Sequence, residues 1–181
     1  MPDPAPPRLA RPVGERLLLR PSGPADAVQA FAIQSDWDVT RMLRMARFPP
    51  DRGEIADWFA DHPRQWAAGE AYRFAVDCDG RMIGLADLDE IRDGAADLGY
   101  WFERSAWGRG HASAVGDALV RFAFAGLGLA RLRSAHATDN PASGRVLVKL
   151  GFQPVDTVQV ASRSRGAEIL QTRYVFDRLY C

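Results

Sequence analysis

Cysteine and histidine are scarce in this 181-residue chain, which contains two cysteines and three histidines. Neither Cys78 nor Cys181 belongs to a CxxC pair, so the sequence lacks the spacing of a disulfide framework or a zinc site. His62, His111 and His136 lie far apart and form no HxxxH pattern. We therefore expect no metal cofactor.

Long apolar runs are absent as well. The most apolar stretches are short and interrupted by Arg, Asp and Gly, whereas a membrane-spanning helix needs about 18 consecutive apolar residues. The proline-rich segment 1–12 lacks the apolar core of a secretory signal. The sequence therefore predicts a flexible N-terminal tail over 1–12, no membrane association and a cytoplasmic protein.

Net charge is also absent, since 23 Lys and Arg residues balance 23 Asp and Glu residues. Without an overall positive field, nonspecific nucleic-acid binding is not expected to be the main activity. The chain length and the 47% hydrophobic content fit one ordinary globular domain, which we place at 13–181. We expect a monomer or a homodimer.

The spacing of apolar residues predicts the secondary structure. It indicates a strand over 15–20, a helix from residue 25, an irregular connector over 37–50 and a helix over 51–68 that Pro63 is expected to break or kink. Alternation over 71–78, 81–88 and 96–102, with Asp79-Gly80 as a hairpin signal, predicts an antiparallel meander.

The second half alternates between helices and strands. A helix is predicted over 112–125, a strand over 131–137, a helix over 141–150 and strands over 152–160 and 168–177. Helices that cross between strands require a mixed sheet with covered faces. The expected fold class is therefore α/β, which some schemes call α+β.

The segment WGRGHA at 107–112 joins a strand to a helix and is the first candidate binding site. Gly108 and Gly110 have no Cβ, so their backbone can approach a ligand closely, and the first N–H groups of a helix suit a pyrophosphate. The Walker pattern and the spaced glycines of a Rossmann fingerprint are absent. Taken alone, this segment is more often an ordinary turn.

A second motif, N-x-x-S-x-x-V-L-x-K-L-G-F at 140–152, makes the pattern specific. It resembles the second cofactor motif of the GNAT superfamily of N-acetyltransferases, particularly the RimJ/RimL-type branch. WGRGHA resembles the superfamily's pyrophosphate motif R/Q-x-x-G-x-G/A, although Trp107 replaces the Arg or Gln. The similarity spans about residues 15–177 and implies a mostly antiparallel sheet splayed into a V that accepts acetyl-CoA.

The resemblance implies an acetyl-CoA-dependent transfer to a primary amine. Backbone groups at 100–102 would pair with pantetheine, the N–H groups at 108–113 would bind the pyrophosphate, and a backbone N–H near residue 102 would stabilise the oxyanion. The implied cofactor-binding residues are Tyr100, Trp101, Phe102, Gly108, Arg109, Gly110, His111, Ala112, Ser113, Asn140 and Arg145.

Two residues match positions linked to proton transfer in relatives. Ser143 is the candidate general acid for the thiolate, although a serine at a helix start is equally often structural. Asp97 is a candidate to receive the amine proton through water, although an exposed carboxylate at a strand end is an equally good interpretation. A chain of water molecules can also deprotonate an amine without one indispensable base.

The acceptor is not specified by any motif. We expect Trp37, Asp36, Asp38 and Asp87 to contribute to an acceptor site. The RimJ/RimL-type branch implies a protein N-terminal α-amine, whereas other relatives acetylate aminoglycosides, polyamines or amino acids. Two further alternatives are a noncatalytic acyl-CoA-binding sensor or scaffold and a nucleotide-binding module, and the absence of phosphate motifs argues against the latter.

Overall fold

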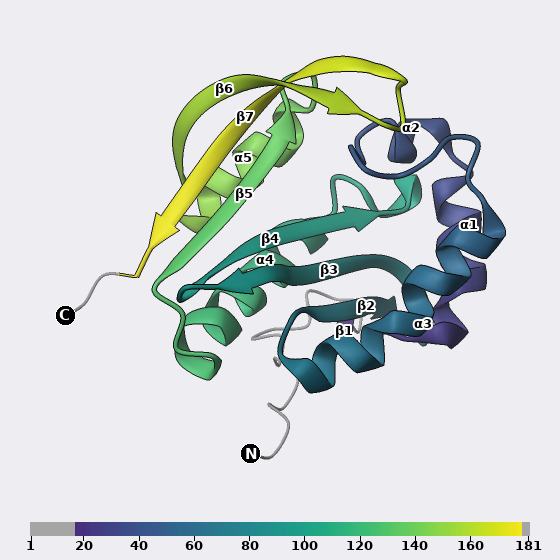
Figure 1. The fold of residues 1–181 in the computed structure, drawn as a ribbon, viewed down its shortest axis with the longest axis horizontal. Coiled ribbons are helices and arrows are strands. Elements are labelled where there is room, and N and C mark those ends of the chain that lie inside the picture. Colours follow the sequence, from purple (N-terminus) through teal and green to yellow (C-terminus); the bar gives the residue numbers. More distant parts are fainter. Residues whose placement is uncertain (1–16, 179–181) are drawn as a thin grey trace.

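The computed structural model describes residues 17–178 (Figure 1). The predicted tail over 1–12, the start of the predicted domain at 13 and Cys181 lie outside the described residues. The strands are β1 (Leu17–Pro21), β2 (Tyr72–Cys78), β3 (Arg81–Arg92), β4 (Ala95–Phe102), β5 (Arg131–Ala137), β6 (Gln153–Ser162) and β7 (Ala167–Asp177). The helices are α1 (Ala27–Gln34), α2 (Trp37–Thr40), α3 (Arg52–Ala68), α4 (His111–Arg121) and α5 (Pro141–Leu150), with short helical turns η1 (Pro24–Asp26), η2 (Arg104–Ala106) and η3 (Phe122–Gly126).

These strands form one sheet in the order β1-β2-β3-β4-β5-β7-β6. Each neighbouring pair is antiparallel except β4–β5, which is parallel because α4 crosses between these two strands. The predicted meander corresponds to β2, β3 and β4. A mixed, mostly antiparallel sheet flanked by helices confirms the predicted fold class.

The sheet opens between β4 and β5. The two strands pair only at Ala95↔Arg131, Ala96↔Leu132 and Asp97↔Arg133. Both strands continue beyond the last pair, β4 to Phe102 and β5 to Ala137, and they diverge toward α2 (Figure 1). The V-shaped splay implied by the resemblance is therefore present, and it leaves part of the β4 edge without a strand partner.

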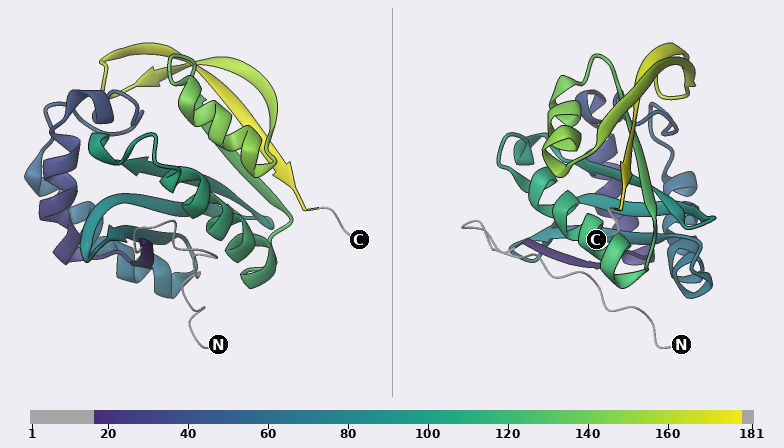
Figure 2. Two further views of the ribbon diagram at one scale, coloured as in Figure 1. Left: turned by 180° about the vertical axis from the view of Figure 1, so that it is seen from behind. Right: turned by 90° about the vertical axis from the view of Figure 1, so that its left-hand side faces the viewer.

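Helices cover both faces of the sheet (Figure 2). Because side chains alternate along a strand, Phe74 and Val76 of β2 pack with the α4 side, whereas Ala75 packs with Phe59 of α3. The larger core lies under α4 and includes Leu119. No helix between residues 17 and 178 is long and apolar enough to cross a membrane.

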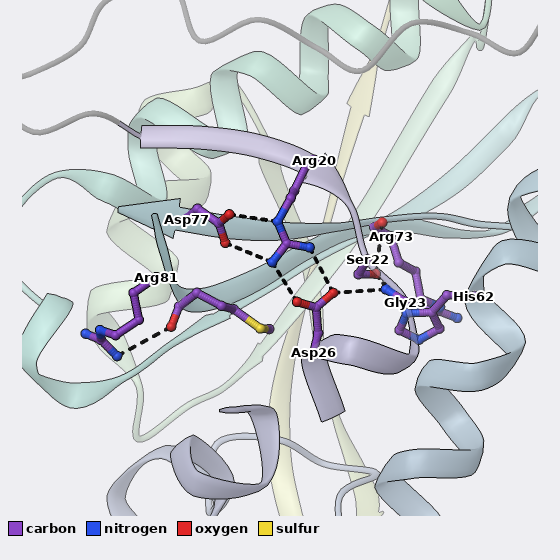
Figure 3. Close-up of polar contacts among 9 residues, drawn as sticks. Arg20, Ser22, Gly23, Asp26, His62, Arg73, Asp77 and Arg81 are labelled. Atoms are coloured by element: carbon purple, nitrogen blue, oxygen red, sulfur yellow. Dashed lines mark hydrogen bonds and ion pairs between the residues drawn. The ribbon is translucent and has the colours of Figure 1, made fainter. Parts of the chain in front are cut away.

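A charged network fixes the first strand and turn to the sheet (Figure 3). The guanidinium of Arg20 donates to Asp77 at 2.7 Å and to Asp26 at 2.6 Å, and both carboxylates are almost fully buried. Nearby, the Ser22 hydroxyl lies 2.8 Å from Nδ1 of His62. Burial lowers the pKa of His62 to about 4, so this histidine is neutral at physiological pH.

Two expectations about the helical layer need correction. The connector over 37–50 is not wholly irregular, because Asp36 caps the short helix α2 by accepting from the Asp38 N–H at 2.9 Å. The helix α3 runs through Pro63 without a break. A proline removes one backbone donor, and the burial of Phe59 and His62 beside it offsets that loss.

Candidate active site

A cavity of about 470 Å³, called the first cavity below, lies where β4 and β5 diverge. It is bounded by the end of β4, the loop before α4, the first turn of α4 and the first turns of α5. The predicted site residues that line it are Tyr100, Trp101, Phe102, Gly108, Gly110, His111, Ala112, Ser113, Asn140, Ser143 and Arg145. Two motifs separated by about thirty residues in the sequence thus meet around one space.

The edge of β4 presents backbone groups to this cavity. The Ser134 hydroxyl donates to the Leu98 carbonyl at 2.8 Å from the β5 side, whereas the Glu103 N–H points the other way, to Ile83 of β3. Since backbone groups alternate along a strand, those of Tyr100 and Phe102 face the gap. Those of Trp101 face β3, so its backbone groups are turned away from the gap, although the residue lines the first cavity.

The start of α4 is built for close approach by a ligand. Gly108 and Gly110 have φ angles of 74° and 82°, a left-handed conformation that strongly favours glycine, and a Cβ at either position would meet no atom within 4 Å. The first helical hydrogen bond runs from the Ala114 N–H to the Gly110 carbonyl. In the part of the chain described, no side chain caps this helix. Its first residues, His111 to Ser113, line the cavity, so the positive end of its dipole faces that space.

The start of α5 places a hydroxyl pair in the cavity. Oδ1 of Asn140 accepts from the Ser143 N–H at 3.3 Å and caps the helix. The Ser143 hydroxyl is therefore not the cap, and it lies 2.9 Å from Oη of Tyr100. Burial raises the pKa of Tyr100 to about 12, so its phenol is protonated at neutral pH.

The sequence predicted a role only for the backbone of Tyr100 and gave no sign of this hydroxyl pair. His136 was not predicted either, although it lines the cavity and its Nε2 lies 3.1 Å from the Tyr174 hydroxyl. Gly144 permits this packing, because a Cβ there would lie 2.6 Å from Nε2 of His136. A glycine one residue after a candidate acid was the available sequence signal for such a close approach.

The connector lies against the β6–β7 hairpin (Figure 1). Arg165 donates to the Arg41 carbonyl at 2.7 Å and to Asp139 at 2.9 Å, and the Arg163 N–H donates to the Arg44 carbonyl at 2.8 Å. These contacts position α2 and the turn after it, which contribute Val39, Met42 and Leu43 to the cavity wall. Residues 17–178 contain no group of three or more His, Cys, Asp or Glu residues arranged for a metal ion.

The comparison with protein families decides what this arrangement is. The sequence profile of the acetyltransferase (GNAT) domain matches residues 16–153, well over half of the chain and inclusive of both motifs. The chain belongs to the GNAT acetyltransferase family. It is accordingly an N-acetyltransferase, as the two motifs implied.

Similar proteins support the assignment. The uncharacterized N-acetyltransferase YoaA of Bacillus subtilis is 33% identical over 143 residues, covering 77% of this chain and 80% of YoaA. Among solved structures, the ribosomal L7/L12 alpha-N-protein acetyltransferase RimL in complex with coenzyme A aligns with a TM-score of 0.80 and 22% identity over 92% of this chain and 96% of that chain. A spermidine N-acetyltransferase from Vibrio cholerae, in complex with coenzyme A and spermine, aligns with a TM-score of 0.77 and 17% identity over 89% of this chain and 95% of that chain.

A second cavity of about 400 Å³ adjoins the first in this acetyltransferase. Leu43 and Trp101 line both cavities. The other walls come from the connector, α3, β2 and β3, and include Trp58, Arg73, Asp87 and Asp89. Two spaces that share a wall can hold the two substrates of a transfer reaction in contact.

The structure does not bring all predicted acceptor residues together. Asp87 lines the second cavity, whereas Asp36 lines a separate open depression and Asp38 pairs with Arg104 at 2.6 Å. Trp37 packs on Phe48 with ring centroids 4.8 Å apart. Trp37 and Asp38 line neither cavity.

Two other predicted residues also lie outside the cavity linings. Arg109 is exposed in the loop before α4. Asp97 lies at the start of β4, where its carboxylate accepts from Arg133 at 2.5 Å. Its role in receiving the amine proton stays a prediction.

Proposed function

We propose that this acetyltransferase binds acetyl-CoA in the first cavity and transfers the acetyl group to the α-amine of a protein N-terminus. The observation that carries the cofactor assignment is the convergence of the two motifs on one cavity at the splay of the sheet. Solved structures of similar fold contain coenzyme A, including those of RimL and the spermidine N-acetyltransferase.

The lining residues suit such a carrier. The gap edge of β4 offers the Tyr100 N–H and carbonyl to an extended pantetheine arm, as an added strand would require. The N–H groups at the start of α4 suit the pyrophosphate, and Arg145 and Lys149 of α5 line the same cavity as cations for a further phosphate. The Phe102 N–H faces the gap and suits the developing oxyanion.

The hydroxyl pair supplies the proton for the leaving thiolate. When Tyr100 donates to Oγ of Ser143, the serine proton is free to point into the first cavity. Ser143 then acts as the general acid, and Tyr100 holds it in position. The neutral amine attacks the thioester carbonyl directly, the carbon–sulfur bond breaks, and the serine proton passes to sulfur.

The mouth of the second cavity favours an N-terminal amine over a polyamine. Arg44 and Arg47 line it and are both exposed. Arg47 pairs with Asp51 at 3.8 Å, whereas Arg44 donates to the Ala161 carbonyl at 3.5 Å. A second ammonium group on the acceptor would be repelled by Arg44, whereas a neutral or acidic peptide would not.

The test is an assay of thiol release from acetyl-CoA with three acceptors: a hexapeptide with an N-terminal alanine followed by acidic residues, the same peptide with a blocked N-terminus, and spermidine. We expect turnover with the free peptide and none with the blocked one. A higher kcat/KM for spermidine would favour the small-molecule alternative. Acetyl-CoA binding by calorimetry without turnover of any amine would favour the noncatalytic sensor.

A further inference from the structure

The second cavity contains more negative than positive charge at its inner end. Nη1 of Arg73 donates to Asp87 at 2.5 Å and to Asp89 at 3.2 Å, so one guanidinium serves two carboxylates. The side chains of Arg73 and Asp87 are only 9% and 13% exposed, so water compensates little of the remaining charge. A bound cation would balance it.

Between residues 17 and 178, Arg73 is the only cation paired with Asp87 or Asp89. Arg44 and Arg47 of the connector line the exposed mouth of the same cavity, where Arg44 donates to the Ala161 carbonyl and Arg47 pairs with Asp51. On β4, Asp97 faces Asp89 across the strand pair and is bound by Arg133. On α3, Glu54 is bound by Arg163. Burial is the main reason that the pKa values of Asp87 and Asp89 are raised, and Arg73 opposes the shift.

The side chain of Asp87 lies over β4, on the face that carries Trp101. Asp87 pairs with Gly99 in the register, and a Cβ at residue 99 would lie 2.6 Å from Oδ1 of Asp87. Oδ1 therefore rests on the bare backbone of β4, while Oδ2 accepts from Arg73. Trp101, which both cavities share, lies two residues further along β4 and on the same face, roughly 7 Å away along the strand.

Aromatic side chains complete the enclosure. Trp58 of α3 and Trp101 of β4 line the second cavity, and the Arg73 guanidinium lies 5.0 Å from the centroid of Trp58. Indole faces attract cations and exclude water. The inner end of the cavity therefore combines surplus carboxylate charge with aromatic walls, a combination that suits a primary ammonium.

We propose that the second cavity binds the acceptor as a primary ammonium at Oδ1 of Asp87, with Asp89 contributing charge, and that Asp87 accepts one proton from it. This inference rests on the proposed acetyl transfer but not on the identity of the acceptor. The ammonium gives one proton to Asp87 and becomes a neutral amine, whose lone pair forms the new bond to the acetyl carbon. After the thiolate leaves and takes its proton from Ser143, the amide nitrogen loses its second proton, which restores the serine through solvent. The proton on Asp87 is then released to water.

The experiment compares Asp87→Asn with wild type, using the free hexapeptide and spermidine as separate acceptors. The asparagine keeps the side-chain shape and an acceptor for Arg73, but it loses the charge and the ability to take a proton. We expect kcat/KM for each accepted amine to fall about 10- to 100-fold, with acetyl-CoA affinity unchanged within about twofold. Gly99→Ala, which displaces Oδ1 without changing charge, is expected to lower kcat/KM in the same direction.

Asp93→Asn is the matched control, because Asp93 is an exposed carboxylate in the β3–β4 turn and its positive φ of 51° suits asparagine. If kcat/KM of Asp87→Asn for each amine lies within twofold of this control, the proposal for Asp87 is overturned. The acetyl-transfer function would remain intact. If Asp87→Asn lowers kcat/KM for spermidine and the peptide is not acetylated at all, the proposal for Asp87 is supported. The proposed protein N-terminal acceptor is then refuted. Turnover of neither amine by protein that binds acetyl-CoA would overturn both proposals.

Discussion

Replacing Tyr100 by phenylalanine tests whether its hydroxyl acts through Ser143. The change removes the 2.9 Å contact between Oη and Oγ and a weaker contact of 3.3 Å to the Ser143 carbonyl. A neutral hydrogen bond contributes about 1 kcal/mol, which corresponds to a factor of about five in rate. Loss of a general acid costs about 100-fold or more, so Ser143→Ala is expected to be the more damaging change.

The double variant gives the decisive comparison. If Tyr100 only positions Ser143, then Tyr100→Phe lowers kcat about fivefold in wild type and has almost no effect in the Ser143→Ala background. The assay is kcat for thiol release, with acetyl-CoA affinity measured separately by calorimetry. Tyr174→Phe is a suitable control, since this buried tyrosine bonds His136 instead. An equal loss in both backgrounds would refute the reasoning, because the two hydroxyls would then act independently.

Three other changes test different parts of the structure. Gly144→Ala is expected to destabilise the fold by about 1–3 kcal/mol in urea denaturation, because its Cβ would lie 2.6 Å from Nε2 of His136. Arg20→Met should cost about 2–3 kcal/mol, since it leaves two buried carboxylates without a counter-charge, and an unchanged urea midpoint would contradict this. Because the pKa of Asp87 is raised, this carboxylate becomes protonated at a higher pH than an ordinary aspartate when the pH is lowered. We therefore expect kcat/KM for the acceptor to decline on the acid side of the pH profile, and we expect Asp87→Asn to lack this decline.

Most elements could be predicted from periodicity because local pattern and burial agree. The strand over 131–137 and the helix over 141–150 match β5 and α5 at both ends. The helix turn in the connector was missed because only four residues form it, too few for a periodic signal. Pro63 does not break α3, because helix propensity is a weak prior once neighbouring residues are buried.

The residues that line the first cavity were largely predictable, whereas those that line the second cavity were not. WGRGHA and the motif at 140–152 are local sequences with fixed spacing, and most of the residues singled out in them line the first cavity. The acceptor predictions relied on isolated acidic and aromatic residues. Only Asp87 of these four lines the second cavity, because the others lie near α2 while Asp87 lies on a central strand.

The amino-acid sequence alone determined the order of elements, the glycine turn before α4 and the family, since each depends on residues close together along the chain. Only the tertiary structure decided which backbone groups of β4 face the gap, that Tyr100 reaches Ser143, and that Asp87 and Asp89 share one arginine. These features join different elements through strand register and packing. A one-residue shift in register would turn every side chain to the opposite face, and no local pattern records that choice.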